Sequence, residues 1–120
     1  MKKKILIIDD EPDILKVTFA RLKVSGYDVI TAASAEEGFK LIGKDKPDLI
    51  LLDLILPGMQ GEDLCKVVKS DKELSKIPVL LFTATVDDIY IKAKLSCADD
   101  YILKPFDPDE LLAKIKKLIK

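Results

Sequence analysis

Residues 5–12 of the chain read ILIIDDEP. Four consecutive apolar side chains are typical of a strand that is buried on both faces, as the strands of parallel sheets are. The run ends abruptly in three acids, and Pro12 suits the first position of a helix. Residues 48–53, which read DLILLD, repeat the pattern of a buried strand that terminates in an acid. Each stretch therefore predicts a strand inside a parallel sheet, with a carboxylate at its carboxyl end.

The rest of the chain continues this alternation of strand and helix patterns. Strands are predicted at 5–8, 28–32, 48–53, 79–83 and 100–104. The predicted helices begin at Pro12 and Ala35, near Leu64, at Asp87 and after Asp107, and Ser34 with Glu37 forms a capping box for the second of them. Parallel neighbours require crossover connections, which are right-handed and usually helical. The order therefore predicts a single doubly wound α/β domain over residues 1–120 with a five-stranded parallel sheet.

Composition excludes several classes of function. Of the 120 residues, 48% are hydrophobic and 34% are charged, which suits a folded domain rather than a disordered chain. The net charge of -1 lacks the positive field of a nucleic-acid-binding protein. With no His and no C-x-x-C motif, the chain cannot form a Ser-His or Cys-His nucleophile pair or a His-ligated zinc site. The first apolar run stops at Ile8, too short for a signal peptide or membrane span, so a cytoplasmic protein without membrane contact is expected.

Polar side chains end four of the five predicted strands. In doubly wound sheets, ligands bind outside the carboxyl ends of the strands, where this chain has Asp9 with Asp10, then Asp53, Thr83 and Lys104. Carboxylates about 4 Å apart repel by roughly 4 kcal/mol per pair at an effective dielectric of 20, so three of them need a cation. An oxygen-only cluster favours Mg²⁺ over Ca²⁺ or softer metals. With a fixed ammonium and a hydroxyl on the same rim, the set predicts a phosphoryl-transfer site.

The sequence resembles the receiver domain of response regulators in two-component signalling, the CheY-like family. The resemblance rests on IIDDEP at 7–12, LDLILPGMQG at 52–61, FTA at 82–84 and ADDYILKPF at 98–106, and it runs along the full chain. It implies a flavodoxin-like (β/α)5 fold with the strand order 2-1-3-4-5. The function that it implies is a signalling switch that depends on phosphorylation.

The resemblance also assigns roles around the acidic cluster. Asp53 would be the phosphoacceptor, and Mg²⁺ would be held by Asp9, Asp10, Asp53 and the backbone carbonyl of Ile55. The phosphoryl group would come from a phosphohistidine on a sensor histidine kinase or a histidine phosphotransfer protein. Such a protein is not a conventional enzyme: it would catalyse its own phosphorylation at Asp53 and a slow autodephosphorylation.

The remaining assignments concern the switch. Thr83 and Lys104 would bind phosphate oxygens, and the peptide bond between Lys104 and Pro105 would be cis. Thr83 and Tyr101 would move together and shift the face made by helix four, strand five and helix five. That face would bind a downstream target that the sequence does not identify, or a second copy in a phosphorylation-dependent dimer. The alternative for Tyr101 is a strand aromatic that packs beside the last helix.

Two positions, Cys97 and Ile55, modify or tune the family pattern. Cys97 stands where the family usually has Gly, so helix four is expected to end differently. We hypothesise that the apolar Ile55 hinders attack of water on the aspartyl phosphate.

The residues after the first predicted strand argue against two other functions. A carboxylate phosphatase would want Asp-x-Asp there, whereas Asp9 and Asp10 are adjacent. A flavin or dinucleotide binder would need a Gly- or Thr-rich phosphate loop, and the sequence DDEP at 9–12 has the wrong charge. The serious alternative is a receiver-fold interaction module that is never phosphorylated.

Overall fold

The structure is a computed structural model that describes residues 2–83 and 98–119, with the backbone alone for Thr83. The predicted fourth helix at 87–95 and the cap at Cys97 lie outside the described residues.

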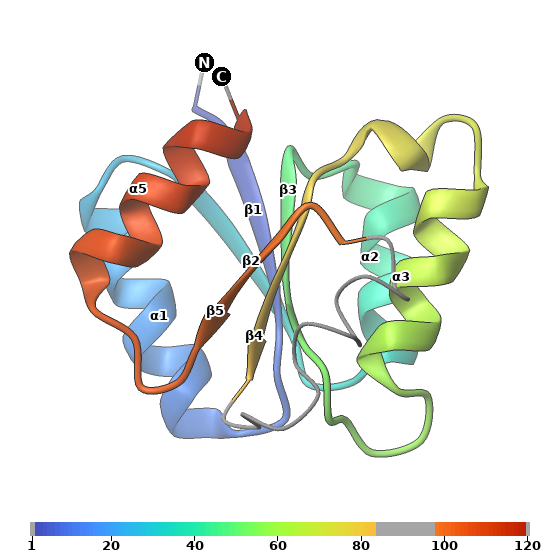
Figure 1. Cartoon of the computed structure of the whole chain (residues 1–120), viewed down its shortest axis with the longest axis horizontal. Coiled ribbons are helices and arrows are strands. Elements are labelled where there is room, and N and C mark those ends of the chain that lie inside the picture. Colours follow the sequence, from blue (N-terminus) through green and yellow to red (C-terminus); the bar gives the residue numbers. More distant parts are fainter. Residues whose placement is uncertain (1, 84–97, 120) are drawn as a thin grey trace.

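The core of the molecule is a five-stranded parallel sheet (Figure 1). Its strands are β1 (Lys4–Ile8), β2 (Asp28–Ala32), β3 (Leu49–Asp53), β4 (Val79–Thr83) and β5 (Asp100–Leu103). Their spatial order is β2-β1-β3-β4-β5, and each neighbouring pair is parallel. The predicted strand order and fold class are therefore confirmed. Two predicted ends were one residue too long: Asp48 precedes β3, and Lys104 follows β5.

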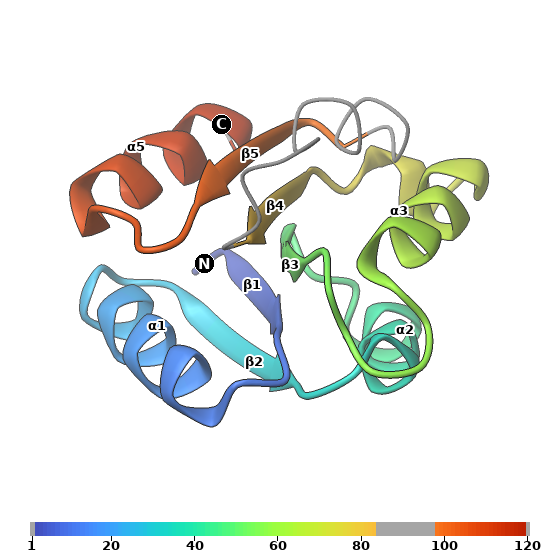
Figure 2. The same cartoon turned by 60° about the horizontal axis from the view of Figure 1, so that its bottom comes forward.

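Helices cover both faces of the sheet. Helices α1 (Pro12–Val24) and α5 (Pro108–Ile119) lie on one face, and α2 (Ala35–Asp45) and α3 (Gly61–Ser70) lie on the other (Figures 1 and 2). A short 3-10 helix, η1 (Leu74–Lys76), connects α3 to β4. Alternate side chains of β1 enter the two cores, Ile5 and Ile7 toward α1 and α5 and Leu6 and Ile8 toward α2 and α3. This two-sided burial is why the central strands are apolar throughout.

Helix starts follow the local chemistry that the sequence suggested. The Ser34 hydroxyl accepts a hydrogen bond from the Glu37 N–H at 3.1 Å, and the Glu37 carboxylate accepts one from the Ala33 N–H at 2.8 Å. Asp107 caps α5 by accepting from the Asp109 N–H at 2.8 Å. These caps set where α2 and α5 begin relative to the sheet, and both begin at its carboxyl edge.

Candidate functional site

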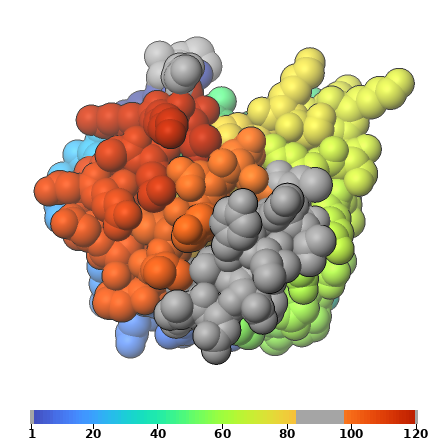
Figure 3. All heavy atoms as spheres, viewed as in Figure 1, coloured from blue at the N-terminus to red at the C-terminus, as the bar shows by residue number. Residues whose placement is uncertain are grey.

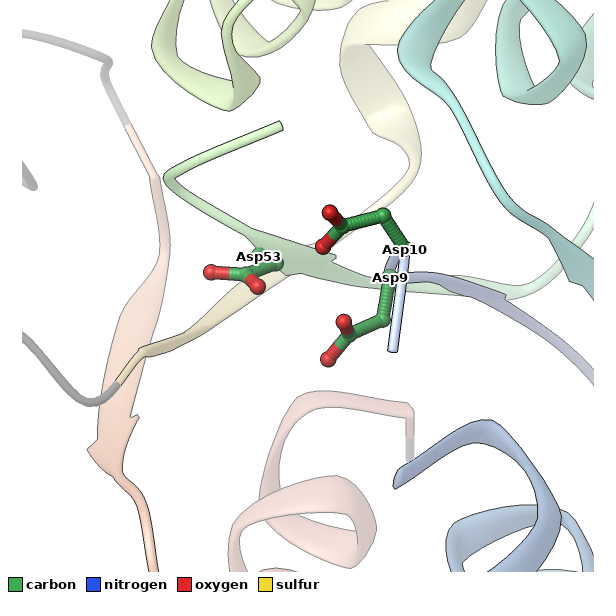
Figure 4. Close-up of side chains that lie close together, drawn as sticks. All are labelled: Asp9, Asp10 and Asp53. Atoms are coloured by element: carbon green, nitrogen blue, oxygen red, sulfur yellow. The ribbon is translucent and has the colours of Figure 1, made fainter. Parts of the chain in front are cut away.

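Three aspartates meet where β1 and β3 end. The two strands are paired with Ile8 opposite Leu52, so the residues that follow, Asp9 and Asp53, lie next to each other. Asp10 completes the group, and one carboxylate oxygen from each residue lies within 4.8 Å of the others. Figure 4 shows all three side chains pointing to the same side. The predicted convergence of these acids is thus present in the structure.

The three carboxylates differ in exposure. Asp9 and Asp53 are buried, with 0% and 5% of their surface exposed, whereas Asp10 is exposed. The site therefore has a closed inner side and an open outer side. A buried carboxylate requires hydrogen bonds or a cation, because burial of an unpaired charge costs several kcal/mol.

Lys104 supplies the positive charge. Its Nζ atom lies 2.6 Å from Asp9 Oδ2, 3.1 Å from Asp53 Oδ2 and 3.5 Å from Glu11 Oε1. The side chain is only 7% exposed, and its ammonium lies 4.6 Å from the centre of the Phe82 ring on the intervening strand β4. The lysine thus reaches across the sheet from the end of β5 and compensates the two buried acids.

The second oxygen of each buried aspartate is held by the backbone. Asp9 Oδ1 accepts from the Glu11 N–H at 2.9 Å, and Asp53 Oδ1 accepts from the Ile55 N–H at 3.2 Å. Each carboxylate therefore has one oxygen on Lys104 and the other on an N–H group two residues further along the chain. These two backbone contacts were not among the predictions, although a local signal for them exists, because an Asp side chain often accepts a hydrogen bond from the N–H two residues further along the chain.

Burial and charge act in opposite directions on the site's pKa values. Burial raises the pKa of Asp53, the charge of Lys104 opposes this, the charge of Asp9 adds to it, and the net shift is upward. Burial lowers the pKa of the Lys104 ammonium, but the hydrogen bond to Asp9 and the charges of Asp53 and Asp9 outweigh burial, so its pKa is raised. Lys104 is therefore a permanent cation at neutral pH.

The donor set fits a hard divalent cation. It consists of three carboxylates on one side of the sheet edge, and the chain has no His that could direct the site toward zinc. Two buried acids and one exposed acid match the way Mg²⁺ is bound, through a few carboxylates with its other positions left to water or phosphate. The carbonyl of Ile55 as a further ligand stays a prediction.

Of the other predicted residues, Thr83 and Lys104 lie at the same edge of the sheet, whereas Tyr101 lies within β5 opposite Leu81. Thr83 ends β4 opposite Leu103 of β5, and its side chain lies outside the described atoms. The Lys104–Pro105 peptide bond is cis, the conformation that the family resemblance implies. Tyr101 is half-buried on β5, packs against the core on the α2 and α3 side, and has the Lys114 ammonium of α5 at 5.9 Å from its ring centre. Its part in a switch stays a prediction.

Comparison with known proteins identifies the family. The model of the response regulator receiver domain matches residues 5–116. PhoP, the alkaline phosphatase synthesis transcriptional regulatory protein of Bacillus subtilis, is 41% identical over 121 aligned positions, which cover 100% of this chain and 50% of PhoP. The DNA-binding response regulator MtrA of Mycolicibacterium smegmatis is 36% identical, over 100% of this chain and 52% of MtrA. The chain thus spans about half the length of these curated relatives.

Solved structures agree. A CheY-like response regulator receiver domain protein from Methanospirillum hungatei is 35% identical with a TM-score of 0.90, over 98% of this chain and 94% of that one. The response regulator TrrA of Thermotoga maritima, solved in complex with Mg²⁺ and BeF, is 33% identical with a TM-score of 0.87, over 97% of this chain and 98% of that one. The fold and site define a phosphoryl-accepting α/β domain. This chain belongs to the response regulator receiver domain family. None of its described helices is long and apolar enough to cross a membrane.

Proposed function

We propose that Asp53 accepts a phosphoryl group from a phosphohistidine and that the chain works as a phosphorylation-dependent switch. The observation that carries this proposal is the environment of Asp53. Its carboxylate lies with those of Asp9 and Asp10, one oxygen is bound by Lys104, and the other is oriented by the Ile55 N–H. A carboxylate in this setting is fixed in direction, paired with a cation and grouped with two further carboxylates that could hold Mg²⁺, as nucleophilic transfer of a phosphoryl group requires.

The transfer can be written with balanced bonds. An Asp53 carboxylate oxygen forms a bond to phosphorus, the P–N bond to the donor imidazole breaks, and the electron pair stays on the imidazole nitrogen. Mg²⁺, held by Asp9, Asp10, Asp53 and the Ile55 carbonyl, would supply positive charge for the phosphoryl oxygens. Lys104 already lies 3.1 Å from Asp53 Oδ2 and would follow the new anionic group. The exposed side of the cluster, at Asp10, is the side from which a donor can approach.

The donor-binding surface that we propose lies on α1. Val17 and Val24 are 66% and 83% exposed and lie one heptad apart on the same side of the helix. They border a hollow of about 360 Å³ lined by Val17, Thr18, Ala20, Arg21, Val24, Phe106 and Pro108. The hollow is formed by α1, which follows Asp10 in the chain, and by residues 106–108, which follow Lys104. Exposed apolar surface of this kind marks an interaction site, and a partner bound there would contact both α1 and the segment that follows Lys104.

The output surface that we propose is formed by β5 and α5, which Figure 3 shows in orange and red. A hollow of about 430 Å³ on this side is lined by Asp100, Tyr101, Ile102, Leu103, Pro105, Glu110 and Lys114. Movement of Thr83 toward a phosphorylated Asp53 would allow Tyr101 to turn inward and change this surface. Its partner would be a downstream target or a second copy of the chain.

Phosphorylation by a small donor tests the proposal. The protein is incubated with acetyl phosphate and Mg²⁺ and its mass is measured. We expect a gain of one phosphoryl group in the wild type, none in Asp53→Asn, and slower but measurable gain in Asp10→Asn. Chelation of Mg²⁺ should abolish the gain. An unmodified wild type would favour the receiver-fold interaction module that is not phosphorylated, and modification that persists in Asp53→Asn would place the acceptor elsewhere.

A further inference from the structure

The loop between β3 and α3, residues 54–60, is in direct contact with Asp53. Its Ile55 N–H donates to Asp53 Oδ1 at 3.2 Å, and at its far end the Gly61 N–H donates to the Leu54 carbonyl at 3.0 Å. A Cβ at Gly61 would overlap the Asp53 carbonyl oxygen, so α3 starts against the strand end itself. The conformation of this loop therefore sets one of the two contacts that orient the Asp53 carboxylate, the other being that of Lys104.

The middle of the loop is fixed from two sides. From inside the loop, Gln60 Nε2 donates to the carbonyls of Leu56 at 2.9 Å and Gly58 at 3.5 Å. From outside, the Glu36 carboxylate in the first turn of α2 accepts a hydrogen bond from the Met59 N–H at 3.2 Å. Figure 2 shows the loop after β3 passing beside α2. Glu36 is thus the side chain by which a separate helix holds the loop.

Gly58 permits this contact. Its φ of +73° lies in the left-handed region, and a Cβ built there would lie 2.9 Å from Glu36 Oε2. A larger residue would strain the backbone and push the carboxylate away. The glycine and the glutamate, more than twenty residues apart in the chain, are therefore matched to each other.

An acid in the first turn of a helix usually serves that helix's own N-terminus, but in α2 this role belongs to Glu37 rather than to Glu36. Acids at this position interact favourably with the helix dipole and cap free N–H groups. In α2 the capping role belongs to Glu37, whose carboxylate accepts from the Ala33 N–H. Glu36 instead uses its carboxylate on Met59, a contact that α2 does not need for its own start.

We propose that Glu36 is a positioning residue for the acceptor site. It holds the loop so that the Ile55 N–H keeps Asp53 oriented and the following Ile55 carbonyl is presented to Mg²⁺. The metal part of this inference rests on the proposed function. Glu36 acts through a hydrogen bond that its side chain accepts. A glutamine at this position should preserve that hydrogen bond, and an alanine should lose it.

Magnesium binding by the full chain, measured by calorimetry, tests the inference. The variants are Glu36→Ala, Glu36→Gln and the matched control Glu37→Ala, which removes the same charge from the neighbouring position. We expect the Kd for Mg²⁺ to rise about fivefold in Glu36→Ala, the equivalent of one lost hydrogen bond of about 1 kcal/mol. Glu36→Gln, which keeps the acceptor but not the charge, should recover most of the affinity. Glu37→Ala should lower stability and raise the Kd no more than Glu36→Gln does, because the two variants lose the same charge from the field around the site.

A second measurement does not involve metal or phosphate. Amide hydrogen exchange of the metal-free protein should become faster at Met59 and Ile55 in Glu36→Ala and stay unchanged there in Glu37→Ala. Unchanged Mg²⁺ affinity and unchanged exchange at Ile55 in Glu36→Ala would overturn the inference. An equal loss of affinity in Glu37→Ala would also overturn it, because net charge would then explain the effect. If acetyl phosphate fails to modify Asp53 while these shifts are found, the proposed function fails and the role of Glu36 stands.

Discussion

Asp53 holds its proton more tightly in the folded protein than an ordinary aspartate does. Its pKa is raised because burial, opposed by Lys104 and assisted by Asp9, disfavours the anion. A raised carboxyl pKa means that the folded state binds the proton better than the unfolded state. Its contribution to stability is therefore greatest at low pH and falls as pH rises from the usual aspartate value near 4 through the raised folded value.

We accordingly expect Asp53→Asn to stabilise the metal-free protein at pH 7. The gain should shrink as pH falls and vanish below the pKa of an unfolded aspartate, where the wild-type carboxyl is protonated in both states. Urea unfolding in a chelating buffer between pH 3 and 7 measures the difference, and titrating groups that do not interact with residue 53 cancel between the two proteins. An asparagine variant that is less stable than the wild type at pH 7 would contradict the raised pKa.

The Ile55 side chain is 53% exposed two residues after the acceptor. An apolar group at this place excludes water from one approach to the aspartyl phosphate, whereas an amide would bind and orient water there. Ile55→Asn should shorten the lifetime of the phosphorylated protein by roughly 3- to 10-fold, or about 0.7 to 1.4 kcal/mol in the barrier. The decay of the phosphorylated mass after donor removal gives the rate. As a control, Val67→Asn makes the same kind of change at a half-exposed position on α3 and should leave the rate of dephosphorylation unchanged.

At the scale of elements, α3 can start where it does only because residue 61 has no side chain. A Cβ there would overlap the backbone of Asp53, which cannot move without shifting β3. Gly61→Ala should therefore cost about 1 to 3 kcal/mol of unfolding free energy and slow phosphorylation of Asp53. Gly43→Ala in α2 is the control, since a Cβ there meets no described atom within 4 Å and should stabilise by about 0.5 to 1 kcal/mol. Urea titration of both variants measures the two changes in unfolding free energy, which should have opposite signs.

The exposed side of α1 gives a second prediction at this scale. Val24→Glu places a charge in the apolar hollow and should slow phosphotransfer from the cognate histidine kinase by roughly tenfold, about 1.4 kcal/mol. Phosphorylation by acetyl phosphate, which needs no docking surface, should be unchanged. The same substitution at Val67 on α3 serves as control. Equal losses with both donors would show that the change damages the site itself rather than the docking of a partner.

The sequence predicted those elements whose pattern is local. The uniform apolar runs of β1 and β3 identify strands buried on both faces, and their terminal acids identify the edge at which the site lies. Prediction failed where a contact depends on how far a side chain reaches. Asp48, predicted as part of a strand, instead turns its carboxylate to the Lys4 N–H at 2.8 Å. The contact of Glu36 with Met59 and that of Lys104 with Asp9 join segments whose spacing in sequence carries no periodic signal.

At the scale of the whole molecule, charge is separated along the direction of the strands. Each described α-helix follows a strand and so begins at the edge of the sheet that carries the site. The first turns are acidic: Asp13 in α1, Glu36 and Glu37 in α2, Glu62 and Asp63 in α3, and Asp109 and Glu110 in α5. The last turns are basic, with Arg21, Lys23, Lys44, Lys69, Lys116 and Lys117. A net charge of only -1 thus conceals a strongly negative field around Asp53.

This field should act oppositely on the two small ions that the site uses. It attracts Mg²⁺ and repels the anionic acetyl phosphate. Raising the salt concentration from about 20 to 200 mM shortens the screening length from roughly 20 to 7 Å and so weakens the field of the exposed acids. The Kd for Mg²⁺ should therefore rise, while the rate of phosphorylation at saturating Mg²⁺ should increase. Calorimetry measures the Kd for Mg²⁺ and mass measurement gives the rate of phosphorylation, both at matched osmotic strength. A rate that falls with salt at saturating Mg²⁺ would mean that the donor meets a positive rather than a negative surface, with Lys104 as its dominant charge.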